Sequence, residues 1–84
     1  DTPGFLSELK IRLENISDFS SINIEIEFKK YLEDNNLGMG RLLPAFRLAL
    51  TGLEMGPSLF DIASLLGKTE TIKRMEVALN TIKS

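Results

Sequence analysis

The stretch GRLLPAFRLALTGLEMGPSLF, residues 40–60, contains a helix, a breaker and the start of a second helix. Its apolar residues recur at the spacing of one helical face and predict a helix over residues 41–50. Pro44 fits that helix because the N–H groups of a first turn have no partner within the helix. Gly52 is the residue type expected just beyond a helix end. The apolar face consists of Leu42, Leu43, Phe46, Ala49 and Leu50.

A second helix should begin at Pro57, because proline suits the first helical position and Gly56 is an acceptable N-cap. On the preceding helix, Pro44, Arg47 and Thr51 fall on one edge beside the apolar face. We expect this edge to lie across the loop from Pro57, so that a cation, a hydroxyl and a helix N-terminus converge. Free N–H groups at such a terminus bind anions and carbonyl-rich groups. A solvated arginine beside a simple Gly-Pro turn would explain the same residues.

The other segments also have helical periodicity, so the predicted fold is an all-α bundle of about five short helices in one domain, residues 1–84. The further helices are expected over residues 4–16, from a cap at Ser20 or Ser21 to Asp34, from Pro57 to Gly67, and from a cap at Thr69 onward. Their core positions are Phe5 or Leu6, Leu9, Leu13, Ile16, Leu59, Ile62, Ala63, Leu65, Leu66, Ile72, Met75, Leu79 and Ile82.

Residues 22–34 fit two patterns. Ile22, Ile24, Ile26 and Phe28 alternate with polar residues, as they would in a strand. A helix would instead bury Ile24, Phe28, Tyr31 and Leu32. We predict the helix, because good helix formers continue to Asp34 and no other segment offers a strand partner.

Composition excludes several classes of function. The chain has no cysteine and no histidine, so disulfides, thiolate metal sites and imidazole catalysis are ruled out. No nucleophile lies beside a base, and Asp34 and Asp61 are expected to cap helices or to be solvated. The apolar runs are too short for a membrane span and no signal segment begins the chain, which indicates a soluble, cytoplasmic protein. Because Asp1 is not an initiator methionine, we expect a segment of a longer chain.

Net charge is −2, which argues against a broad basic surface for nucleic acid. The charges are nevertheless uneven, since carboxylates crowd residues 25–34 and cations gather in residues 68–74. A nucleic acid would therefore be bound by a few placed groups. Glu70 and Arg74 should form an i, i+4 ion pair.

Three strings carry a family resemblance: Phe46-Arg47-Leu48-Ala49-Leu50-Thr51-Gly52, Gly56-Pro57-Ser58-Leu59-Phe60 and Leu65-Leu66-Gly67-Lys68. Together they resemble the C-terminal anticodon-binding region of bacterial glutamyl-tRNA synthetases, most strongly over residues 37–68. The resemblance implies a helical cage around the unstacked anticodon bases of glutamate tRNA. Its partners would be that tRNA and the rest of a monomeric, cytoplasmic synthetase. The parent would use ATP and Mg²⁺ in an upstream catalytic domain, whose HIGH-like and KMSKS-like signatures are absent here, so this fragment would hold no cofactor.

The resemblance also implies binding residues. Arg47 matches a helix arginine that contacts the third anticodon base, a role that suits its planar fork. Pro57, Leu59 and Phe60 match the loop and helix start that pack around the middle and third bases. Thr51 shares the edge of Arg47.

Gly56, Ser58 and Lys29 match the family pattern less closely. Gly56 stands where many members have serine or threonine, so only a backbone contact could remain there, and Ser58 replaces the usual glycine. Lys29 falls near a position that is basic in some members.

A helical protein-interaction module with no RNA role is the alternative interpretation. It predicts that exposed apolar residues such as Leu48 and Met55 matter more than Arg47. A helix-turn-helix DNA binder is disfavoured, because residues 57–61 carry no cation that could read a base.

Overall fold

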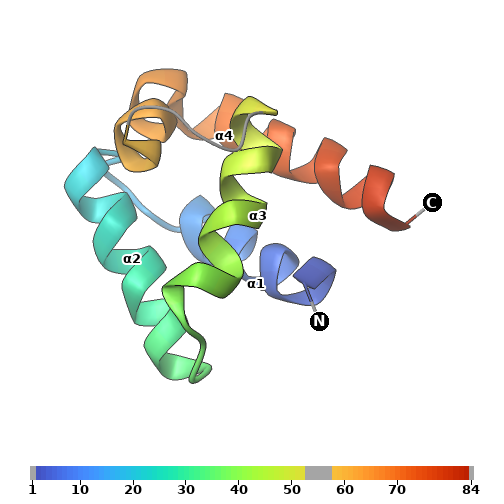
Figure 1. Ribbon diagram of the computed structural model, residues 1–84. Coiled ribbons are helices and arrows are strands. Elements are labelled where there is room, and N and C mark those ends of the chain that lie inside the picture. The colour runs from blue at the N-terminus through green and yellow to red at the C-terminus, as the bar shows by residue number, and fades with distance from the viewer. Residues whose placement is uncertain (1, 53–57, 84) are drawn as a thin grey trace.

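The computed structural model describes residues 2–52 and 58–83, which form four helices around one core (Figure 1). The helices are α1 (Thr2–Glu14), α2 (Ser21–Asp34), α3 (Met39–Thr51) and α4 (Leu59–Lys83). Helix α4 contacts each of the other three. The described residues contain no strand, which confirms the predicted all-α class. None of the four described helices has the length and apolar character that a membrane span needs.

The predicted count of about five helices differs from the four observed. Gly67 has φ 85° and ψ 163°, a conformation that is open essentially only to glycine, and it interrupts the helical geometry inside α4. Helix α4 therefore consists of two helical segments that meet at Gly67, which is where the sequence predicts one helix to end and the next to begin.

Helix ends deviate from prediction by about one turn or less. Helix α1 runs from Thr2 to Glu14 instead of over residues 4–16, and the N–H groups of Asn15 and Ile16 close it with turn-type bonds. Helix α3 starts at Met39, after an N-cap position at Gly38. Pro44 thus lies beyond the first turn, contrary to expectation, where it removes an N–H donor on the exposed side.

The start of α4 is also later than predicted. The helix begins at Leu59, and the N–H of Ile62 donates to the Ser58 carbonyl at 3.1 Å. Ser58 therefore holds the N-cap position expected for Gly56, with Asp61 in the first turn. Gly56 and Pro57 lie outside the described residues.

The ends of α2 are closed by local polar chemistry. The Ser20 hydroxyl accepts a hydrogen bond from the Asn23 N–H at 3.3 Å, which confirms a predicted cap. Beyond the C-terminus, Asn36 takes a left-handed φ of 53°, and the Leu37 N–H bonds to the Leu32 carbonyl at 2.8 Å. This is a Schellman ending in which asparagine takes the place usual for glycine.

The buried side chains follow the helical pattern. For residues 22–34 the helical interpretation is confirmed, since Phe28 is fully buried whereas Ile22 and Ile26 are 68% and 58% exposed. Leu65 was expected in the core but is 88% exposed, because six positions from buried Leu59 carry it about 240° around the helix. The core comprises Leu6, Leu9, Leu13, Ile24, Phe28, Tyr31, Leu32, Leu42, Phe46, Leu50, Leu59, Ala63, Ile72, Met75 and Leu79.

Three phenylalanines join α2, α3 and α4. The Phe28 ring stacks on Phe46 with centroids 5.5 Å apart and meets the edge of Phe60 at 5.5 Å. Phe28 and Phe46 are fully buried, while Phe60 is partly exposed. The cluster fixes the start of α4 against the residue that precedes Arg47 in α3.

Candidate nucleic-acid interface

Arg47 and Thr51 lie one turn apart at the C-terminal end of α3, and both are half-buried. The Thr51 hydroxyl donates to the Arg47 carbonyl at 2.9 Å. Its oxygen keeps lone pairs that can accept a hydrogen bond from another group. The two predicted residues therefore share one turn of one helix.

The end of α3 is closed by backbone and side-chain donors together. Gly52 takes the left-handed conformation, φ 72°, and its N–H donates to the Leu48 carbonyl at 2.9 Å. This confirms the predicted glycine ending. Arg74, from α4, donates through Nη1 to the Leu50 carbonyl at 2.5 Å. Helix α3 is thus tied at its C-terminus to the second half of α4.

The Arg74 side chain is itself oriented by Glu70. Its Nε donates to the Glu70 carboxylate at 2.8 Å, as the i, i+4 spacing predicts. This hydrogen bond lowers the pKa of Glu70. The sequence could show the pair but not the bond to Leu50, because that partner lies 24 residues away.

Helix α4 begins at the same end of the bundle where α3 ends, at the top of Figure 1. Of the residues predicted there, Leu59 is only 2% exposed and belongs to the core. A contact of Leu59 with RNA would therefore involve its backbone. Phe60 is partly exposed, with its ring against Phe28.

Lys29 lies on α2, a different helix from Arg47. Its ammonium pairs with the Glu25 carboxylate at 2.7 Å, one turn earlier on the exposed side, and its side chain is 57% exposed. Surface pairs of this kind contribute little and exchange readily for another partner.

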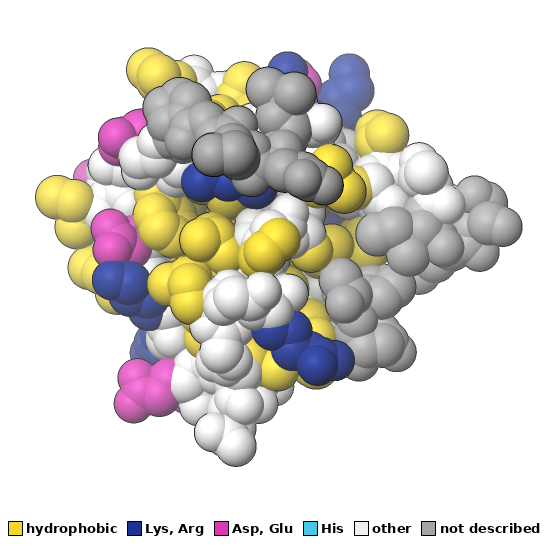
Figure 2. Space-filling view, in the orientation of Figure 1, with side chains coloured by type: hydrophobic (Ala, Val, Ile, Leu, Met, Phe, Trp, Pro, Cys, Tyr) yellow, Lys and Arg dark blue, Asp and Glu magenta, His cyan; other side chains and the backbone are white. Residues whose placement is uncertain are grey.

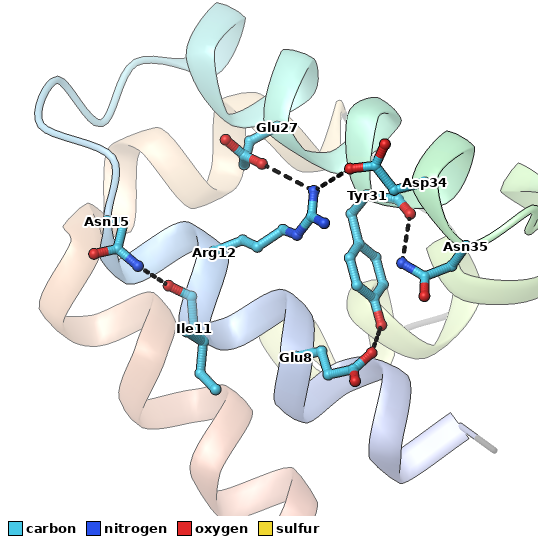
Figure 3. Close-up of polar contacts among 8 residues, drawn as sticks. All are labelled: Glu8, Ile11, Arg12, Asn15, Glu27, Tyr31, Asp34 and Asn35. Atoms are coloured by element: carbon cyan, nitrogen blue, oxygen red, sulfur yellow. Dashed lines mark hydrogen bonds and ion pairs between the residues drawn. The ribbon is translucent and has the colours of Figure 1, made fainter.

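A polar seam joins α1 to α2 on another side of the bundle (Figure 3). The Arg12 guanidinium lies 2.9 Å from Asp34 and 3.5 Å from Glu27, and 5.0 Å from the centre of the Tyr31 ring. Asp34, expected to be a cap or solvated, is therefore an ion-pair partner. The hydrogen bond to Asp34 raises the pKa of Arg12.

Tyr31 completes this seam by donating its hydroxyl to Glu8 at 2.6 Å. Burial raises the Tyr31 pKa, and the bond to the Glu8 carboxylate raises it further. The seam explains why the acidic crowding of residues 25–34 does not make a free negative patch, since several of these carboxylates already face cations.

Most described cations likewise have partners within the protein. Two that form no hydrogen bond or ion pair among the described side chains are Lys30 and Lys73. Figure 2 shows Lys and Arg side chains scattered singly or in small groups among apolar ones, with no continuous basic surface on that face. The paired cations include Lys10 with Glu14 and Glu76, and Lys68 with the Glu14 carbonyl. Among residues 2–52 and 58–83, no group of three potential ligands could hold a metal ion.

Comparison with known proteins identifies the class to which this bundle belongs. Residues 1–79 match the family described as the anticodon binding domain, and the chain belongs to that family. It is 45% identical over 82 residues to the glutamate–tRNA ligase of Flavobacterium johnsoniae, and 41% identical over 83 residues to that of Phocaeicola vulgatus. These alignments cover 98% and 99% of the chain but 16% of each relative. No solved structure matches the chain.

Proposed function

We propose that this chain is the anticodon-recognition module of a glutamate–tRNA ligase. The observation that carries the proposal is the family match over residues 1–79, together with glutamate–tRNA ligases at 41–45% identity along almost the whole chain. The module would hold the anticodon loop of glutamate tRNA. An upstream catalytic domain of a monomeric, cytoplasmic parent would use ATP and Mg²⁺ to attach glutamate.

The end of α3 provides the first contact in this proposal. Arg47 offers a planar set of donors that can bind a base edge or stack on an unstacked base. Thr51 stands beside it with an oxygen that can accept from a base amino group. The two would read one base from adjacent positions on one helical turn.

The start of α4 provides the second contact. Ile62 bonds back to Ser58, so the N–H groups of Leu59, Phe60 and Asp61 precede the first intrahelical bond and have no partner within the helix. Asp61 is exposed in this turn, and its negative charge disfavours a phosphate there. The helix start therefore suits a base edge better than the RNA backbone. Pro57 and Gly56 would line the same site.

The charge distribution fits recognition by few contacts. The chain carries a net charge of −2, and most described cations are paired. Non-specific attraction to phosphates should then be weak, and sequence should be read mainly by base contacts. Lys29 would contribute only after exchanging Glu25 for a phosphate.

The test is a binding titration of the chain with the anticodon hairpin of glutamate tRNA, against a hairpin whose three anticodon bases are changed. Arg47→Ala should weaken binding of the cognate hairpin by about 1–3 kcal/mol and reduce the preference between hairpins. Lys73→Ala is the matched control, because it removes an exposed cation from the same end of the protein. It should weaken both hairpins alike and act through salt dependence. Equal effects of the two substitutions would contradict base reading by Arg47.

One observation favours a second candidate, a protein-interaction module. Leu48 and Val77 are 56% and 58% exposed and line an open groove between α3 and α4. If this groove is the functional surface, Leu48→Ala should abolish partner binding while Arg47→Ala leaves it intact. Met55, the other apolar residue predicted to matter there, lies outside the described residues.

A further inference from the structure

We infer that Arg74 is a positioning residue for RNA recognition, which fixes the end of α3 against α4 and thereby fixes Arg47 in the geometry that a base requires. The inference rests on the proposed function. It concerns a residue outside the predicted contact set, on a helix half that carries none of the predicted contacts.

The Arg74 contact is suited to hold a helix end. Its Nη1 donates to the Leu50 carbonyl at 2.5 Å, and its Nε donates to Glu70 at 2.8 Å. The last carbonyls of a helix carry partial negative charge and lack N–H partners, so a guanidinium there gains both a hydrogen bond and a favourable field. Because Glu70 accepts a hydrogen bond from Nε, the guanidinium is held in an orientation that directs Nη1 toward the Leu50 carbonyl.

Arg74 differs from the other donors at this helix end. The Thr51 hydroxyl bonds to the Arg47 carbonyl, and the Gly52 N–H bonds to the Leu48 carbonyl. Both donors belong to the same chain segment as their acceptors, so they shape the last turn without fixing it in space. Arg74 comes from α4 and ties the backbone of that turn to another helix. The buried side chain of Leu50 anchors the same turn in the core.

This tie bears directly on Arg47. Leu50 lies three residues after Arg47, so the two are neighbours on one helical surface. Terminal turns fray unless they are held, and a side chain on a fraying turn presents its donors over a range of positions. With Arg74 in place, the Arg47 backbone is held by the core through Phe46 and by α4 through Leu50.

A direct contact between Arg74 and RNA is the competing explanation. It is disfavoured because Nε and Nη1 already have partners in the protein. Lys73, the adjacent residue, is exposed without an ion pair and is the better candidate for a direct phosphate contact. The two explanations differ in whether the loss of hairpin affinity on replacing Arg74 requires Arg47 to be present.

The test is a double-mutant cycle on the full 84-residue chain. Hairpin affinity is measured for Arg74→Met and Lys73→Met, each in the wild-type and Arg47→Ala backgrounds, with the altered-anticodon hairpin as reference. Arg74→Met should weaken the cognate hairpin about tenfold in the wild type and less than twofold beside Arg47→Ala, since coupled network residues are non-additive. Lys73→Met should have the same effect in both backgrounds. Amide resonances of residues 47–52 in the free protein should move for Arg74→Met and stay for Lys73→Met.

Arg74→Lys is the control for a loss of hairpin affinity that comes only from unfolding. It retains the charge and donors for the Leu50 carbonyl and Glu70 but loses the planar fork that meets both in fixed directions, so its affinity should lie between those of the wild type and Arg74→Met. An Arg74→Met effect that persists fully beside Arg47→Ala would overturn the inference, and so would wild-type affinity in a folded Arg74→Met. If the wild type itself does not distinguish the two hairpins, the proposed function fails and the inference fails with it. If the wild type distinguishes them and the cycle is additive, the inference alone fails.

Discussion

Replacing Phe46 by leucine should measurably destabilise the domain, because Phe46 is fully buried and stacks on Phe28 at 5.5 Å. A swap between apolar side chains of similar size costs up to about 1.5 kcal/mol. Loss of an aromatic pair adds about 0.5–1.5 kcal/mol. We therefore expect a total of about 2 kcal/mol, a large part of the roughly 4–13 kcal/mol that a domain of this size has available. The melting temperature should fall by about 8–16 °C.

The assay is urea unfolding followed by far-ultraviolet circular dichroism, which is sensitive to an all-helical protein. Ile22→Ala is the control, because Ile22 is 68% exposed and a surface change should stay within about 0.5 kcal/mol. Phe60→Leu should fall between the two, since its ring is only partly buried and meets Phe28 edge-on. If Phe46→Leu costs no more than Ile22→Ala, the three-phenylalanine core is not what holds α3 in place.

Four further predictions concern two glycines, the titration of Tyr31 and the effect of salt. Gly67→Ala should cost about 1–3 kcal/mol, since φ 85° with ψ 163° is strained for any side chain. Gly40→Ala, in open space inside α3, should instead stabilise by about 0.5–1 kcal/mol in the same unfolding assay. Tyr31, the single tyrosine, should ionise well above its ordinary pKa of 10.0 by tyrosinate absorbance. The stability that folding gains from the neutral phenol is therefore complete below the ordinary pKa and is lost as pH rises through the folded pKa. A Tyr31 that titrates at its ordinary pKa would contradict the hydrogen bond to Glu8. Affinity for the anticodon hairpin should fall with salt by a log–log slope of about −1 to −2, as expected for one or two phosphates met by Lys73 and few other free cations.

The helical class and much of the core could be predicted because both depend on local spacing. Ile24 and Phe28 are buried, as a helical period requires, and Ile22 is exposed. Gly52 and Ser20 were identifiable for the same reason, since glycine past a helix end and serine before a helix start act through their immediate neighbours.

Errors arose where a choice between local alternatives depends on the rest of the fold. Leu65 and Leu66 are equally apolar but lie at different angles around α4, and the sequence does not show which side faces the other helices. Proline at position 57 predicts a helix start there, whereas α4 begins at Leu59 and its Ile62 N–H donates to the Ser58 carbonyl. Gly67 interrupts the helical geometry as predicted, but the sequence does not show that the two segments meet there without a loop.

Contacts between helices were beyond the sequence altogether. The bond from Arg74 to Leu50 and the pair between Arg12 and Asp34 join residues more than 20 positions apart, and their partners are fixed only when the helices pack. Each residue has a plausible local or solvated role in the sequence. For the candidate site, spacing alone brought Arg47 and Thr51 together, and the apolar periodicity already placed Leu59 in the core, where it is 2% exposed.

The measurement that tests the central claim most directly is an NMR titration of this chain with the glutamate-tRNA anticodon hairpin and with the hairpin carrying three altered anticodon bases. We expect shifts at Arg47, at Thr51 and over residues 56–60, and their loss with the altered hairpin. Identical shifts with both hairpins, or shifts confined to Lys30 and Lys73, would contradict base recognition at the junction of α3 and α4.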